Sequence, residues 1–90
     1  MAYTYIPGRT VQYHMNRLAG TLDVFDVPTL DAQGAANKYA GTIGLGIVGA
    51  LNIKAGITDP SQFLEIQGIL NYLAGTSGLG ENEASARITS

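Results

Sequence analysis

The chain has 90 residues, which allows one small domain with a limited core. Only 13% of the residues are charged and 46% are apolar, so part of the apolar surface is expected to contact a partner or another copy of the chain. The absence of cysteine excludes disulfides and thiolate metal sites. A net charge of −2 without a basic patch argues against binding to nucleic acid.

Residues 1–9 are expected to form an extended N-terminal arm that precedes a single domain of residues 10–90. Tyr3 and Tyr5 alternate as in a short strand. Together with Ile6, these tyrosines are candidate contacts to a partner, because an extended arm can add to a neighbouring sheet or surface.

A second non-helical segment is TLDVFDVP at residues 21–28, which is rich in β-branched and aromatic residues and ends in a proline. This composition predicts a short strand. The strand could pair with the arm as a small two-stranded ribbon. Phe25, in the middle of the segment, is a further candidate contact to a partner.

The rest of the chain contains an internal repeat. The ten residues that begin at Asn37 (NKYAGTIGLG) and at Asn71 (NYLAGTSGLG) share seven identities at a spacing of 34 residues. Shorter versions begin at Asn16 and Asn52, so four segments have the pattern Asn-x-x-Ala-Gly. These segments end at Gly20, Gly41, Gly56 and Gly75. A fifth, truncated copy is expected over residues 79–88.

Each unit predicts one short helix, because alanine and leucine favour helix and the closing glycine suits a left-handed C-terminal cap. Each asparagine lies in the last turn, where its amide is expected to bond the helix end or the next connection and fix the turn. Thr10 and Thr29 are predicted N-caps of the first two helices, and Asp59 that of the fourth. The predicted core is Leu30, Ile47, Leu51, Leu64, Ile69, Leu70 and Leu73.

Three glycines recur at one helical register, three residues before an asparagine. They are Gly34, Gly49 and Gly68. A glycine inside a helix costs about 1 kcal/mol relative to alanine, so this recurrence predicts close crossing of helix backbones.

The stretch GLGIVG at residues 44–49 has the spelling G-x-G-x-x-G of dinucleotide-binding turns. Gly44 and Gly46 recur as Gly78 and Gly80, however, and the preceding residues predict the end of a helix where that motif requires a strand. The repeat therefore accounts for the glycines, and no cofactor is expected.

Catalytic patterns and membrane spans are not expected either. His14 is the only histidine, and the carboxylates are explained by caps and exposed faces. The most apolar run, residues 42–53, is well short of the roughly 20 residues that cross a bilayer. The sequence thus predicts a non-enzymatic, all-α domain of four to five short helices in tandem repeats with glycine-capped turns. An irregular right-angled array or a solenoid-like bundle is the expected arrangement.

The units LDAQGAANKYAGT, LGIVGALNIKAG and FLEIQGILNYLAGTSGLGENEAS resemble short helical segments with the pattern N-x-x-AGT-x-GL in structural proteins of tailed phages that infect actinobacteria. The resemblance covers residues 13–86, although the first unit and the third, which has AGIT for AGT, depart from the pattern. It implies a virion component, for which a minor capsid or decoration protein bound to capsid subunits and to copies of itself is favoured.

Two alternatives remain open. One is a minor tail or tail-tip protein, which the same composition would suit. The other is a small module that binds glycan or the host cell wall, with exposed aromatic side chains in a groove. Its candidate aromatics are Tyr13, Tyr39 and Tyr72.

Overall fold

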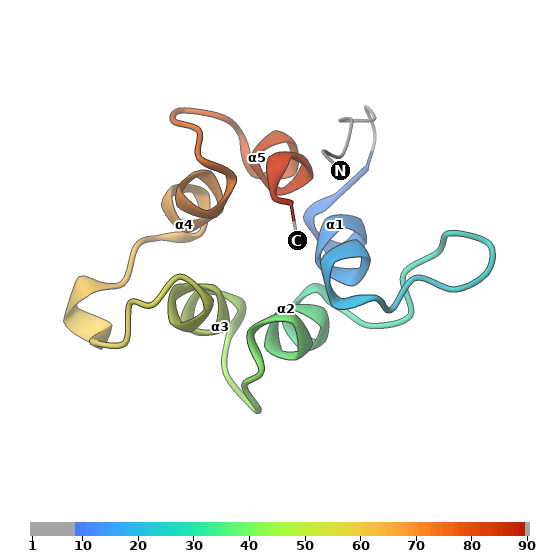
Figure 1. The fold of residues 1–90 in the computed structure, drawn as a ribbon, viewed down its shortest axis with the longest axis horizontal. Coiled ribbons are helices and arrows are strands. Elements are labelled where there is room, and N and C mark those ends of the chain that lie inside the picture. The colour runs from blue at the N-terminus through green and yellow to red at the C-terminus, as the bar shows by residue number, and fades with distance from the viewer. Residues whose placement is uncertain (1–8, 90) are drawn as a thin grey trace.

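The structure, a computed structural model, describes residues 9–89 and contains five α-helices arranged in a closed ring (Figure 1). Consecutive helices contact each other, and the last one returns to contact the first. The predicted all-α domain of short helices is confirmed. The helices form a ring that closes on itself, which the expected right-angled array or solenoid-like bundle did not specify. The helices are α1 (Val11–Ala19), α2 (Ala32–Ala40), α3 (Ile47–Lys54), α4 (Ile66–Ala74) and α5 (Glu81–Arg87), with a 3₁₀ helix, η1 (Pro60–Gln62), between α3 and α4.

Each helix buries the same three consecutive positions of its unit. The third position is the repeated asparagine, which Ala86 replaces in α5. Ile88, just after α5, is also buried and joins the core. Alanines of α2, α3 and α5 leave room in this core for larger side chains from α1, α3 and α4. The buried triplets are 14–16, 35–37, 50–52, 69–71 and 84–86.

The predicted core is correct in part. Three of its residues are fully buried, namely Leu51, Ile69 and Leu70. Leu64 is exposed at 36%, and the remaining three, Leu30, Ile47 and Leu73, are only half-buried. Leu30 and Leu64 each lie two residues before a helix and outside the buried triplets, so helical periodicity does not apply to them.

The repeated asparagines join each helix to the connection that follows it. Asn37 Nδ2 donates to the carbonyl oxygens of Gln33 (2.9 Å) and Leu45 (2.7 Å), and its Oδ1 accepts from the Leu45 N–H (3.2 Å). Both backbone groups of the leucine before the next helix are thus satisfied by one amide. Equivalent pairs are Asn16 with Leu30, Asn52 with Leu64, and Asn71 with Leu79.

Glycine ends three of the helices in the left-handed conformation. Gly20, Gly41 and Gly75 have φ of 74°, 75° and 72° and occupy the C-cap position. Helix α3 differs, because Ala55 is its C-cap in the right-handed conformation and Gly56, with φ of 87°, follows.

The first residue of each of the later helices is determined more by the hydrogen bonds of the preceding asparagine than by the N-capping pattern in the sequence. Thr10 caps α1 as predicted, accepting from the Tyr13 N–H. Asp31, and not Thr29, caps α2, and Asp59 caps η1 while α4 begins only at Ile66. Each of α2, α3, α4 and α5 begins two residues after the leucine that the preceding asparagine holds, which overrides local capping preference.

The close helix crossings predicted at the helical glycines are wrong. A Cβ at Gly49 would lie 3.7 Å from the Leu45 Cβ and 3.8 Å from a Phe63 ring carbon, both ordinary contacts. A Cβ at Gly68 would lie 3.5 Å from the Leu64 Cβ. The neighbours are therefore side chains of the preceding connection or the following one, and no helix backbone presses on these positions.

Replacing Gly49 by alanine should accordingly stabilise the protein by about 0.5–1 kcal/mol, because the backbone is already helical and the methyl group fits. Gly34→Ala is the matched control. Its Cβ would lie only 2.9 Å from the Asp31 carboxylate that caps α2, so no gain is expected. Urea unfolding of both variants measures the difference. Destabilisation by Gly49→Ala would restore the close-approach explanation.

The strand predicted at residues 21–28 is a loop between α1 and α2. Its ends meet at an isolated antiparallel bridge between Leu22 and Pro28, and Asp26, with φ of 66°, reverses the chain. A ribbon with the arm would require residues 1–8, which lie outside the described residues.

The ring is closed by polar contacts between α1 and α5. Arg17 Nη2 donates to the carbonyl oxygens of Ser85 (3.3 Å) and Ile88 (3.0 Å). The Val11 N–H donates to Asn82 Oδ1 (3.1 Å). These bonds replace the asparagine–leucine pairs found at the other four junctions.

Candidate functional site

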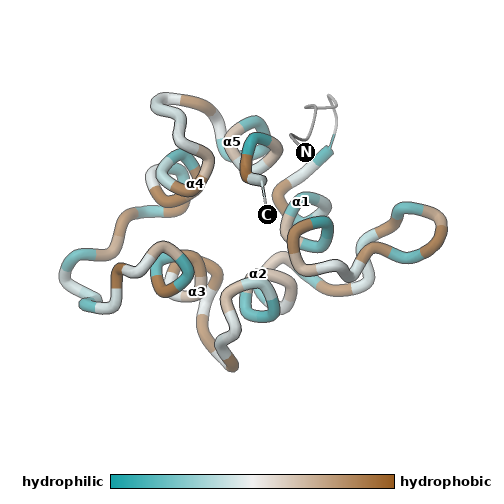
Figure 2. The backbone as a smooth tube through the Cα atoms, in the orientation of Figure 1, coloured by the Kyte–Doolittle hydropathy of each residue, from teal (hydrophilic) through white to brown (hydrophobic). Residues whose placement is uncertain are grey.

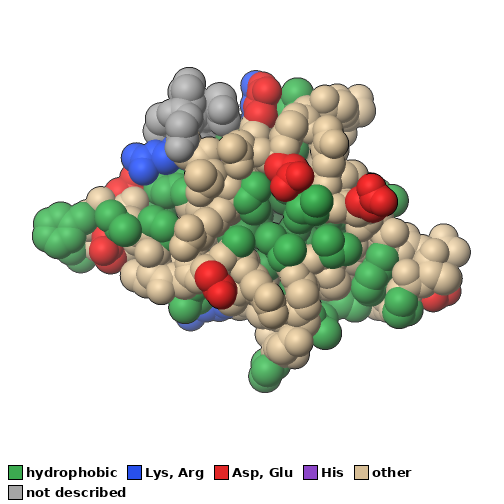
Figure 3. Space-filling model, turned by 180° about the vertical axis from the view of Figure 1, so that it is seen from behind, with side chains coloured by type: hydrophobic (Ala, Val, Ile, Leu, Met, Phe, Trp, Pro, Cys, Tyr) green, Lys and Arg blue, Asp and Glu red, His purple; other side chains and the backbone are tan. Residues whose placement is uncertain are grey.

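The loop between α1 and α2 carries an apolar tip that the fold leaves uncovered. Val24 is 93% exposed, Phe25 82% and Val27 50%. Hydropathy along the backbone marks this tip as apolar (Figure 2), and hydrophobic side chains project there at the left edge of the molecule in the view from behind (Figure 3). These adjacent exposed apolar side chains make the tip a candidate contact site.

Hydrogen bonds within the loop hold the tip in one shape. Asp23 Oδ1 accepts from the N–H groups of Phe25 (2.8 Å) and Val27 (3.0 Å), as in an Asx turn. The Asp23 N–H donates to the Val27 carbonyl, and the Asp26 N–H to the Asp23 carbonyl. At the base of the loop, Thr29 donates through its hydroxyl to the Thr21 carbonyl (2.6 Å).

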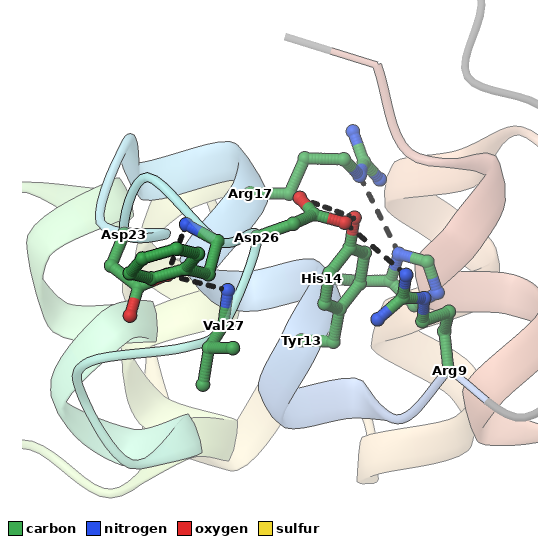
Figure 4. A network of polar contacts seen from close by, with 8 residues as sticks. Arg9, Tyr13, His14, Arg17, Asp23, Asp26 and Val27 are labelled. Carbon is green, nitrogen blue, oxygen red and sulfur yellow. Dashed lines mark hydrogen bonds and ion pairs between the residues drawn. The ribbon is translucent and has the colours of Figure 1, made fainter.

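Asp26 fastens the loop to α1. Its two carboxylate oxygens accept from the Tyr13 hydroxyl, at 3.0 and 2.8 Å, and one of them accepts from Arg9 Nη2 at 3.2 Å (Figure 4). The Arg9 guanidinium also lies 4.3 Å from the centre of the Tyr13 ring. Because Tyr13 is buried, the loop is anchored on a fixed part of the ring of helices. We call Arg9, Tyr13 and Asp26 the loop anchor.

Next to the loop anchor, the buried His14 pairs with the half-buried Arg17. Arg17 Nε donates to His14 Nδ1 at 3.4 Å, while its Nη2 closes the ring of helices. His14 is fully buried. Burial, followed by the positive charges of Arg17 and Arg9, lowers the pKa of His14 from 6.5 to about 4. The imidazole is therefore neutral near pH 7.

The structure separates the predicted site residues. Tyr3, Tyr5 and Ile6 lie outside the described residues, whereas Phe25 lies at the exposed tip. The structural asparagines and glycines are distributed around the ring and form no common site.

Sequence reasoning missed the loop anchor and the role of Arg17. The residues that make these contacts are separated by 13 to 71 positions, and their types are common. The available indication was the pattern Asp-Val-Phe-Asp, in which two carboxylates flank an apolar pair.

An open hollow of about 450 Å³ lies elsewhere, beside α2 and the connection to α3. The aromatic side chains proposed for glycan binding do not line it. Tyr13 is buried, Tyr39 is half-buried beneath the Lys54 ammonium, and Tyr72 is 58% exposed on α4. The hollow is lined by Asp31, Gln33, Gly34, Asn37, Lys38, Thr42, Ile43 and Gly44.

Comparison with protein-family models, curated protein sequences and solved structures finds no match to this chain. Within residues 9–89, no helix has the length and apolar character needed to cross a membrane. In the same part of the chain, no three histidine, cysteine or carboxylate side chains gather as a metal site would require.

Proposed function

We propose that the chain is a non-enzymatic structural protein of a phage virion that decorates the capsid. The observation that carries the proposal is the exposed Val24–Phe25 tip, held in one shape by the loop anchor. A fixed apolar projection suits attachment to another protein, because the loop is already ordered and loses little conformational entropy on binding. The resemblance of the repeated units to phage structural proteins supplies the virion setting.

We also propose that the chain is a tandem repeat of one helix-and-connection unit with glycine-capped turns. The support is the same amide bonding at four successive junctions, each with an asparagine and the leucine that precedes the next helix. Such units pack mainly against their neighbours. A ring of them presents its connections outward, where loops of different length can be accommodated.

Counting copies in purified phage particles tests the placement. Quantitative mass spectrometry of the virions should find the chain in hundreds of copies, as expected for a protein on the capsid lattice. A handful of copies, in threes or sixes, would contradict the capsid placement and favour the tail or tail tip. Absence from particles, with the chain present only in infected cells, would contradict the virion proposal.

A further inference from the structure

We propose that copies of the chain stack head to tail, with the acidic face of one ring of helices on the basic face of the next. The partner is a second copy, and the two faces of the ring are the contact surfaces. The inference goes beyond the proposed function, because it concerns contacts between copies and is tested on purified protein without phage particles.

All five helices begin on the same face of the ring. In each of α1 to α4, the repeated asparagine bonds the carbonyl of the second residue of its own helix and the leucine that precedes the next helix. The start of each helix therefore lies beside the start of the next. The Val11 N–H completes the series by donating to Asn82 Oδ1 in the first turn of α5. We call the face with the helix starts the N-terminal face and the face with the last turns the C-terminal face; Figure 1 views the ring along the helices.

The two faces carry opposite charges. The N-terminal face has three exposed carboxylates at helix starts, namely Asp31, Glu65 and Glu81. The C-terminal face has three exposed cations in last helical turns, namely Lys38, Lys54 and Arg87. Seen from behind, acidic side chains surround an apolar centre (Figure 3). Such charges also stabilise each helix through its dipole, but that effect requires no particular order of charges around the ring.

Only one of the five rotations of one ring on another places all three carboxylates over exposed cations. The carboxylates lie on α2, α4 and α5 of the upper copy, and the cations lie on α2, α3 and α5 of the lower copy. Turning the upper copy by three helix positions in chain order brings the two sets together. The resulting pairs are Glu65 with Lys38, Glu81 with Lys54, and Asp31 with Arg87.

The Glu65–Lys38 pair should contribute most to this register. Both side chains are exposed, and within residues 9–89 neither forms an ion pair. Arg87, in contrast, already pairs with Glu83 at 3.3 Å. The half-buried Arg17 is engaged in closing the ring, and in this register it faces the start of α3, which has no carboxylate.

Apolar side chains on both faces add to the charges. On the C-terminal face, Tyr72 is 58% exposed in the last turn of α4, at the position where α1, α2 and α5 have a base. On the N-terminal face, the four leucines bonded by the asparagines are half-buried or, for Leu64, 36% exposed. Burial of this surface supplies attraction, whereas the exposed ion pairs mainly determine which rotation is adopted.

Each face is large enough for such a contact. The molecule measures 39 by 28 Å across the ring, and a standard interface buries about 800 Å² on each partner, a patch about 28 Å on a side. The contact joins different surfaces of the two copies, so it can repeat as a column. The loop between α1 and α2 projects from the outer edge of the ring (Figure 1), and stacking leaves the Val24–Phe25 tip free.

Sedimentation of the purified chain tests the proposal. Between about 10 µM and 1 mM protein, the sedimentation coefficient should rise through dimers to larger species. Raising the salt concentration from about 50 mM to 0.5 M should weaken the association, because the ion pairs are exposed. Absence of association at 1 mM protein and low salt would contradict the stacking. Growth that stops at a dimer would also contradict it, because it would indicate a symmetric contact.

Charge reversal tests the register. Glu65→Lys and Lys38→Glu should each weaken association at least about fivefold, since each places like charges together. The double variant reverses the pair and should restore the affinity to within about twofold. Its matched control combines Glu65→Lys with Lys54→Glu. Both double variants keep the net charge of −2, but in the control the new lysine still faces Lys38, so the affinity should stay low.

The outcomes separate this inference from the proposed function. Equal association of the unaltered chain and both single variants would show that these faces do not meet. Equal restoration by the two double variants would show that the proposed rotation is wrong. All four side chains changed in these tests are exposed, so circular dichroism should find each variant folded. If copy counting places the chain on the capsid but the purified chain does not stack, this inference alone is wrong.

Discussion

Replacing Asn52 by alanine should lower the free energy of unfolding by about 3–4 kcal/mol. Asn52 is fully buried, and its amide bonds the carbonyl oxygens of Val48 (2.8 Å) and Leu64 (3.0 Å) and the Leu64 N–H (3.0 Å). The alanine variant removes the partner of the Leu64 N–H and C=O, whereas the Val48 carbonyl still accepts a bond from the helix backbone, and each unsatisfied buried group costs about 1–3 kcal/mol. For a domain of this size the loss corresponds to a fall in Tm of roughly 15–30 °C.

Urea unfolding followed by circular dichroism measures this loss. Thr58→Ala, an exposed substitution in the same connection, is the control and should change stability by less than about 0.5 kcal/mol. Asn52→Asp tests whether the amide is needed both as a donor and as an acceptor. It retains an acceptor for the Leu64 N–H but directs a carboxylate at two carbonyl oxygens, so it should also destabilise. A loss below about 1 kcal/mol for Asn52→Ala would show that the amide bonds contribute little.

The same bonds explain which parts of the fold were predictable. The pattern Asn-x-x-Ala-Gly located all four of the helices that contain it, because the glycine ends the helix locally and the asparagine acts within its own turn and the next connection. The fifth helix was predicted from the spacing of the repeat alone, which places Ala86 where the other units have asparagine. Features that depend on residues close in the sequence could therefore be predicted from the sequence.

Helix starts were less predictable, because a distant group decides them. Asp59 and Pro60 form a good start pattern, and the chain does make a short 3₁₀ helix there. Helix α4 nevertheless begins only at Ile66, since Asn52, twelve residues earlier, bonds both backbone groups of Leu64, and the next residue, Glu65, is an extended N-cap. A local capping pattern cannot contain that information.

Ring closure and the loop anchor could not be predicted from the sequence, for a related reason. Arg17 reaches Ser85 and Ile88 across 68 and 71 positions, and no periodic pattern links them. Asp26 meets Tyr13 only after α1 and the loop have been placed side by side. Phe25 could be identified as a candidate contact from composition, but its exposure depends on these tertiary contacts.

Acidification from pH 6.5 to pH 4 should remove about 3 kcal/mol of stability through His14 alone. Burial is the main reason that the pKa of His14 is lowered to about 4 in the folded protein, and the charges of Arg17 and Arg9 add to it. Between these two pH values, His14 binds a proton in the unfolded chain, where its pKa has the ordinary value of 6.5. In the folded chain it remains unprotonated. The contribution of His14 to the free energy of unfolding is therefore fully present above about pH 6.5 and decreases as the pH falls toward 4. Below pH 4 this residue causes no further loss.

A protonated His14 would also lose its role as acceptor for Arg17 Nε, at the junction where Arg17 closes the ring of helices. Early loss of protection from amide hydrogen exchange in α5 and in the adjacent part of α1 would report this local opening. The other helices should remain protected, because the asparagine–leucine bonds that join them carry no titratable group.

His14→Ile provides the control, since α4 has Ile69 at the same register and buries it fully. The difference in unfolding free energy between the unaltered chain and this variant should shrink by about 3 kcal/mol, or reverse, as the pH is lowered from 7 to 4, because the variant has nothing to protonate there. Comparing the two chains cancels the contribution of the carboxylates, which they share. Parallel stability curves for the two chains across this range would show that His14 is protonated equally in the folded and unfolded states, and would remove it as a determinant of ring closure.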